Sequence, residues 1–139
     1  MSSLLAHLWQ AGRNESLATQ LLDQGTFKEW AVVTTFYSAL HYVEAAATRL
    51  PGIMHCETSR PAGFHGSVHD WRDDVVMQHF TSAWLSYRKL RIQSVIARYL
   101  TAVGRPTAAE PVEDFWSDQD VHDFVDNDLN QIRNSLGFA

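Results

Sequence analysis

One segment of this chain constrains the fold more than any other, the run WAVVTTFYSALHYVEAA that begins at Trp30. Its apolar residues cover two adjacent faces of a helix, and so wide an apolar arc indicates a helix buried on most sides. One face carries Val33, Tyr37, Leu40 and Glu44, and the adjacent face carries Val32, Phe36, Ala39, Val43 and Ala46. A central helix of this kind needs other helices around it, so the segment predicts an all-α, up-down bundle of four to five helices.

The central helix is predicted to span residues 26–49. Thr26 and Glu29 have the T-x-x-E spacing of a capping box, in which two side chains satisfy backbone N–H groups at the start of a helix. Pro51 and Gly52 then end it, because proline cannot continue a helix and glycine favours turns.

The first and last helices are each marked by apolar residues at helical spacing and by a glycine that follows the last turn. The first is predicted over residues 3–24, with Gly25 as its stop, and a turn at Gly12 is an alternative to one continuous helix. The last is predicted over residues 117–136, from an S-x-x-D capping box to Gly137. Its apolar stripe consists of Val121, Val125, Leu129, Ile132 and Leu136.

Two more helices are predicted between these ends. A short one begins at Ser67, which has Asp70 three residues later as in a capping box. A long one spans residues 76–100, and we expect the break between the two helices within residues 74–78. The apolar stripe of the long helix contains Phe80, Trp84, Tyr87, Leu90, Ser94 and Ala97.

Size and composition predict a single globular domain over residues 1–139, with a core in residues 4–100 and the helix at 117–136 added to it. At 139 residues, 45% hydrophobic and 19% charged, the chain has the composition of a folded domain rather than of a disordered one. The net charge of −5 argues against a broad nucleic-acid-coating surface, although it leaves room for a local arginine cluster.

Cysteine usage and hydropathy bear on the compartment. Cys56 is the single cysteine, which fits a reducing cytosol, so we expect a cytoplasmic protein. The first residues lack the basic start of a signal peptide. His41 and Glu44 interrupt the longest apolar run, so no membrane association is expected. No cofactor is expected either.

The stretch HCETSRPAGFHGSVHDWRDD raises the question of a metal site. Nitrogen and sulfur ligands of this kind suit zinc, and the candidate ligands are His55, Cys56, His65 and His69. Their spacing matches no familiar zinc signature, and the alternative is a set of solvated or hydrogen-bonded loop histidines. Cys56 and His55 are also adjacent, which rarely orients a nucleophile toward its base.

Arg72 and His79 are seven residues apart, which on one helix places them on one face two turns apart. Arginine can hold a phosphate, and His79 or the neighbouring His69 can act as acid or base. Together they would cleave RNA without a metal, because the 2′-hydroxyl supplies the nucleophile. The alternative is a surface arginine paired with Asp70, Asp73 or Asp74.

A second polar set lies beside the apolar stripes of the two long helices. Arg91 and Arg98 are seven residues apart on the later helix, and His41 and Glu44 on the central helix are their candidate partners. Arginines beside a core usually need carboxylates. The four side chains therefore predict either an interhelical polar network or a polar binding cleft.

These segments carry a resemblance to a known family. The run WAVVTTFYSALHYVEAA, H-x-x-R at His69 and Arg72, and Y-R-K-L-R-x-x-S-x-x-A-R-Y from Tyr87 to Tyr99 resemble bacterial HEPN-domain proteins. The likeness covers residues 4–99. It implies a helical bundle that is often a homodimer. Many members are metal-independent ribonucleases, and some are toxins paired with a nucleotidyltransferase-type antitoxin.

The ribonuclease motif of that family is R-x4-6-H, commonly with asparagine after the arginine. Arg72 is followed by Asp73 in place of asparagine, and Arg133 has the asparagine but Phe138 in place of the histidine. The resemblance thus implies either a toxin-like endoribonuclease with a degenerate motif or a non-catalytic module that binds a nucleotide, RNA or a protein. A zinc-binding domain is the third alternative.

Overall fold

The computed structural model describes residues 3–52, 60–99 and 115–138, and these residues form an all-α bundle. Its helices are α1 (Ser3–Gln24), α2 (Lys28–Ala47), α3 (Val68–His79), α4 (Thr81–Tyr99), α5 (Asp118–Asp123), the π-helical turn η2 (Phe124–Asp128) and α6 (Leu129–Ser135). No strand occurs among the described residues. The predicted fold class is therefore confirmed.

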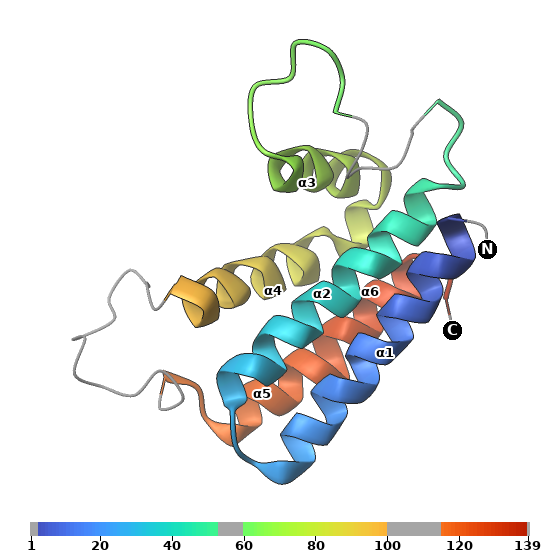
Figure 1. Cartoon of the computed structure of the whole chain (residues 1–139). Coiled ribbons are helices and arrows are strands. Elements are labelled where there is room, and N and C mark those ends of the chain that lie inside the picture. The colour runs from blue at the N-terminus through green and yellow to red at the C-terminus, as the bar shows by residue number, and fades with distance from the viewer. Residues whose placement is uncertain (1–2, 53–59, 100–114, 139) are drawn as a thin grey trace.

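In Figure 1, α1 and α2 form an antiparallel hairpin, and the C-terminal segment from α5 to α6 runs alongside them. The helix α4 packs against α2 and α6, whereas α3 lies across the upper end of the bundle. None of the helices in the described part of the chain has the length and apolar character needed to cross a membrane.

The helix α2 is the centre of the core, as its wide apolar arc predicts. Val32, Phe36 and Val43 are fully buried, and Tyr37 lies at the half-buried edge of the helix. Most residues of the predicted stripes of α4 and of the C-terminal helix join residues of α1 and α2 in one hydrophobic cluster, and Ser94 and Val125 are buried outside it. The C-terminal segment therefore completes the same core as the first four helices.

Local signals placed several helix ends correctly. The capping boxes of Ser67 with Asp70 and of Ser117 with Asp120 both form. Gly25 and Gly137 have φ angles of 70° and 87°, the left-handed conformation that ends a helix at low cost for glycine. The helix α1 is continuous through Gly12, so the alternative with a turn there is wrong.

The predicted start of α2 is wrong, because Thr26 does not cap it. Phe27 is the N-cap residue instead, in the left-handed conformation (φ 55°, ψ 45°) and without a side-chain cap. Lys28 follows it, and its Nζ lies 2.9 Å from Oδ1 of Asp118 and 3.3 Å from the carbonyl oxygen of Trp116. The start of α2 is thus tied to the C-terminal segment rather than to its own capping box.

The predicted break within residues 74–78 is also wrong, since α3 continues to His79. The break falls at Phe80, whose φ of −130° and ψ of 50° are not helical. Phe80 packs against both the main core cluster and a smaller cluster around Ala47 and Val75. The chain therefore turns where an aromatic side chain reaches two cores, which helical periodicity does not reveal.

Candidate anion-binding site

A buried ion pair joins α3 to α2. Nε of Arg72 lies 2.6 Å from Oε1 of Glu44, and the two side chains are 2% and 0% exposed. This contact corrects two expectations, because Glu44 is not the partner of Arg91 or Arg98, and Arg72 is not a surface arginine paired with Asp70, Asp73 or Asp74. The pair connects α3 to α2 across the buried side of α3.

His69 lies one turn before Arg72 on α3, and its Nδ1 is 3.2 Å from an Nη of Arg72. A guanidinium can only donate hydrogen bonds, so Nδ1 accepts, and the neutral imidazole carries its proton on Nε2. Burial lowers the pKa of His69, and the charges of Arg72, Arg91 and Arg98 lower it further. His69 is therefore a neutral, half-buried donor that contacts Arg72 and whose pKa is lowered by the charges of Arg91 and Arg98 as well.

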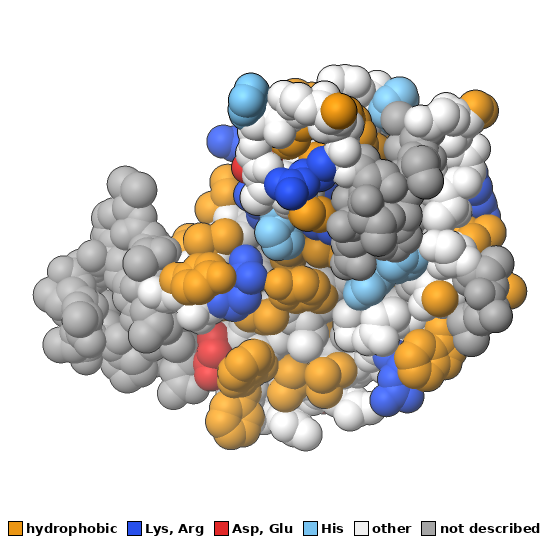
Figure 2. Space-filling model, turned by 45° about the horizontal axis from the view of Figure 1, so that its top comes forward, with side chains coloured by type: hydrophobic (Ala, Val, Ile, Leu, Met, Phe, Trp, Pro, Cys, Tyr) orange, Lys and Arg blue, Asp and Glu red, His pale blue; other side chains and the backbone are white. Residues whose placement is uncertain are grey.

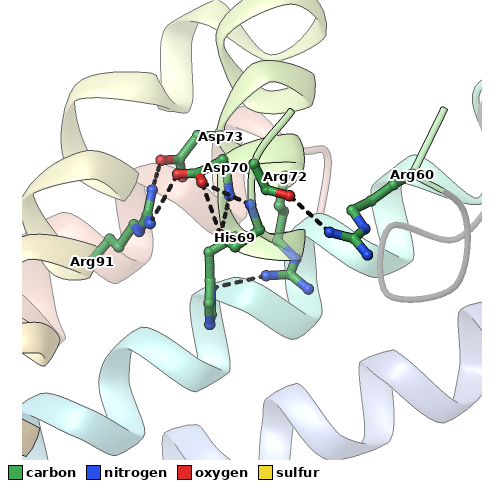
Figure 3. A network of polar contacts seen from close by, with 8 residues as sticks. Arg60, His69, Asp70, Arg72, Asp73 and Arg91 are labelled. Atoms are coloured by element: carbon green, nitrogen blue, oxygen red, sulfur yellow. Dashed lines mark hydrogen bonds and ion pairs between the residues drawn. The ribbon is translucent and has the colours of Figure 1, made fainter. Parts of the chain in front are cut away.

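Arg91 of α4 faces the other side of α3. Its guanidinium pairs with the carboxylate of Asp73 and, at 3.4 Å, with Oδ1 of Asp70. Asp70 also accepts hydrogen bonds from the backbone and side chain of Ser67, and these bonds, followed by Arg91, lower its pKa. Figure 3 shows that Asp70 and Asp73 face Arg91, whereas the side chains of His69 and Arg72 point toward α2.

Arg98 lies two turns after Arg91 on α4 and has a different environment. It donates a hydrogen bond of 3.0 Å to the hydroxyl of Tyr37 and a long one to the carbonyl oxygen of Ser94. Its guanidinium also lies over the rings of Tyr37 and Tyr99, 5.7 Å and 5.1 Å from their centroids. No carboxylate of the described residues forms an ion pair with it.

The structure thus brings together five of the predicted site residues at the junction of α2, α3 and α4. These are Glu44, His69, Arg72, Arg91 and Arg98. His79 is not part of this group, because it is exposed at the last residue of α3 while Arg72 is buried.

His41 also lies in a different contact, with its Nδ1 2.9 Å from Nδ1 of His7 on α1. Of the candidate zinc ligands, His55 and Cys56 lie outside the described residues, and His65 is exposed. Among the residues that the structure describes, no three His, Cys, Asp or Glu side chains are grouped as a metal ion would require.

Arg133, which is the second partial match to the ribonuclease motif, belongs to another cluster. One of its Nη atoms lies 2.9 Å from Oε2 of Glu15 on α1, and the other lies 2.6 Å from Oδ1 of Asn130. Phe138 packs on the ring of Tyr42, whose hydroxyl donates to Glu15. This cluster joins α1, α2 and α6, and it is separate from the group around His69.

Sequence reasoning missed the partners that decide how the arginines behave. Tyr37 was placed on an apolar face, yet its hydroxyl holds Arg98. Asp73 was expected beside Arg72 and instead takes Arg91. The position of Tyr37 at the edge of the apolar arc was an available signal, whereas the choice between two arginines near Asp73 had none.

The face shown in Figure 2 differs from the overall acidic balance of the chain. Lys, Arg and His side chains lie there among hydrophobic ones, and few acidic side chains are visible. Such a mixture of cationic and apolar groups suits an anionic ligand with aromatic parts. Comparison of the chain with family models, with curated proteins and with solved structures gives no match.

Proposed function

We propose that this chain is a HEPN-like helical module that binds a nucleotide or single-stranded RNA, without cleaving it, at the junction of α2, α3 and α4. The observation that carries the proposal is the state of Arg98. It is half-buried, held by Tyr37, and without an ion pair to a described carboxylate. An arginine held in this way retains its positive charge for a ligand, and a phosphate matches its fork of donors.

The neighbours of Arg98 support the same ligand class. His69, as a neutral imidazole with Nδ1 engaged, offers its Nε2–H as a second donor. Tyr99 is 62% exposed, and its ring supplies an aromatic surface on which a base can stack. Phosphate contacts at Arg98 and His69, together with stacking on Tyr99, account for a nucleotide-sized ligand.

The contacts of Arg72 and His69 favour binding over cleavage. Arg72 is buried against Glu44, so we assign it the role of positioning His69 rather than of holding a phosphate. While Nδ1 of His69 accepts from Arg72, its Nε2 carries a proton and is unable to act as a general base. His79, the other candidate acid or base, is exposed outside this group.

Fluorescence anisotropy with a labelled single-stranded RNA, in EDTA, tests the proposal. Arg98→Gln is expected to weaken binding by about 10-fold, since one charged phosphate contact is worth about 1.5 kcal/mol. Arg88→Gln is the matched control, because Arg88 is an exposed arginine on the same helix. Equal affinities of the two variants would refute the assignment of Arg98.

The same samples, run on a denaturing gel, separate binding from cleavage. We expect intact RNA. Cleavage that persists in EDTA and disappears in Arg72→Ala or in His69→Ala would replace the binding module with the endoribonuclease. A mononucleotide added as competitor shows whether one nucleotide is enough to occupy the site.

A further inference from the structure

Arg91 and Arg98 share one face of α4 but differ in what holds them. They are seven residues apart, a rise of about 10 Å along the helix. Arg91 contacts Asp70 and Asp73 of α3, the helix that carries His69, and the charges of both arginines lower the pKa of His69. Arg98 is held by a tyrosine hydroxyl, whereas Arg91 is held by the carboxylates of Asp73 and Asp70.

We infer that Asp73, with Asp70 beside it, competes with the bound anion for Arg91 and thereby limits the affinity of the site. This inference rests on the proposed function. A phosphate at Arg98 lies two helical turns from a second guanidinium on the same face of α4, which two carboxylates already occupy. The ligand therefore gains Arg91 only when that side chain leaves Asp73, and until then the carboxylates repel the ligand.

The exposure of the pair allows this exchange. The side chains of Arg91 and Asp73 are 25% and 17% exposed, and that of Asp70 is 51% exposed. The pair is partly buried but keeps contact with water, so its net contribution lies between that of a surface pair and that of a buried pair, and a phosphate can compete for the guanidinium. The buried pair of Arg72 and Glu44 behaves differently, because separating it would leave two charges in the core.

Among the residues that the structure describes, the side chain of Asp73 makes its polar contact with Arg91. Its Oδ2 faces Arg91, while Oδ1 is buried and has no hydrogen-bond partner among the described residues. Asp70, in contrast, also caps α3 through Ser67. Substitution of Asp73 therefore tests the competition for Arg91 without removing the cap of the helix that carries His69.

The experiment measures RNA affinity by anisotropy for Asp73→Asn and for Asp74→Asn, its neighbour on the same helix. Asp73→Asn is expected to bind about 3- to 5-fold more tightly than the wild-type chain, and Asp74→Asn to change affinity less. If Arg91 then contacts a phosphate, the slope of log K against log salt concentration steepens by about 0.7. A purely structural role of Asp73 would not produce that slope change.

A double variant decides whether the gain passes through Arg91. Asp73→Asn with Arg91→Gln should lose the gain that Asp73→Asn shows alone. Arg91→Gln in the wild-type background should weaken binding by less than about 3-fold, because Arg91 is already occupied. That second measurement does not depend on the folding of Asp73→Asn.

The outcomes distinguish this inference from the proposed function. Equal gains in Asp73→Asn and Asp74→Asn, or a gain that survives removal of Arg91, would overturn the competition and leave the binding site in place. If the wild-type chain binds RNA and Asp73→Asn does not bind it more tightly, the competition is likewise overturned and the binding site remains. Absence of RNA binding in every variant would remove both proposals together.

Discussion

Nε of Arg72 on α3 lies 2.6 Å from Oε1 of Glu44 on α2, inside the core of the bundle. Glu44 is fully buried and Arg72 is 2% exposed, so water hardly solvates either charged group. The contact connects α3 to α2, and the same guanidinium donates to Nδ1 of His69. The stability of the bundle and the geometry of the candidate site thus share one contact.

We expect Glu44→Ala to lower the free energy of unfolding by about 3–5 kcal/mol, because it removes the carboxylate that faces a buried guanidinium. Urea denaturation followed by circular dichroism measures the loss. Asp118→Ala is the control, since its pair with Lys28 has a carboxylate that is 79% exposed. That variant should lose less than about 1 kcal/mol, and similar losses in both would contradict the buried pair.

A second variant separates the pair from its individual charges. Glu44→Leu combined with Arg72→Met replaces both groups with apolar side chains. The double variant should be more stable than either single variant, because neither charge is then left in the core. If His69 depends on Arg72 for its position, the double variant should still lose RNA affinity.

The pKa of His69 is expected below its ordinary value of about 6.5, because burial and three arginines disfavour the imidazolium. The unfolded chain takes up a proton in the pH window between the lowered pKa and the ordinary one, while the folded chain remains neutral at His69. The free energy of unfolding should therefore fall as the pH is lowered through that window. Above the window, His69 is neutral in both states and this loss of stability does not occur.

NMR titration of the His69 ring protons measures the pKa, and denaturation at neutral and mildly acidic pH measures the stability change. His69→Gln should show a smaller loss of stability on acidification than the wild-type chain. A His69 resonance that titrates at or above the ordinary value would contradict the arrangement of arginines around it.

Phe27→Gly is expected to raise the free energy of unfolding by up to about 1 kcal/mol, because a side chain in the left-handed conformation is strained. Phe27 has a φ of 55°, and its side chain is 54% exposed, so little buried area is lost. Gly25→Ala is the opposite control, since Gly25 has a φ of 70° and alanine there introduces strain. A clear loss of stability in Phe27→Gly would assign the Phe27 side chain a packing role.

The pKa of Tyr42 is expected above 10, raised by burial and by the carboxylate of Glu15, while Arg133 opposes the rise. Arg133→Gln should therefore raise the pKa of Tyr42 further, and Glu15→Gln should bring it closer to the ordinary value. Ultraviolet difference titration measures phenolate formation, and subtraction of the Tyr42→Phe curve isolates this residue. Unchanged titration in Arg133→Gln would contradict the cluster.

Local sequence patterns predicted those parts of the fold that depend on neighbours along the chain. The capping boxes at Ser67 and Ser117 form because each needs only a residue three positions away. Periodicity likewise identified the buried stripes of α2, α4 and the C-terminal helix. The break at Phe80 escaped prediction because contacts with two distant clusters place that side chain. The start of α2 escaped it because Phe27 adopts a left-handed conformation that is uncommon for a residue other than glycine.

The sequence by itself determined the all-α fold and the central position of α2, and it singled out the charged residues of α2, α3 and α4 as two separate sets. Only the tertiary structure decided the pairing of these residues, with Arg72 on Glu44, Arg91 on Asp73 and Arg98 on Tyr37. The physical reason is that helical spacing sets which residues share a face, whereas partners across helices depend on where α3 crosses α2 and α4. That crossing buries one arginine, neutralises the second and leaves the third beside two tyrosines.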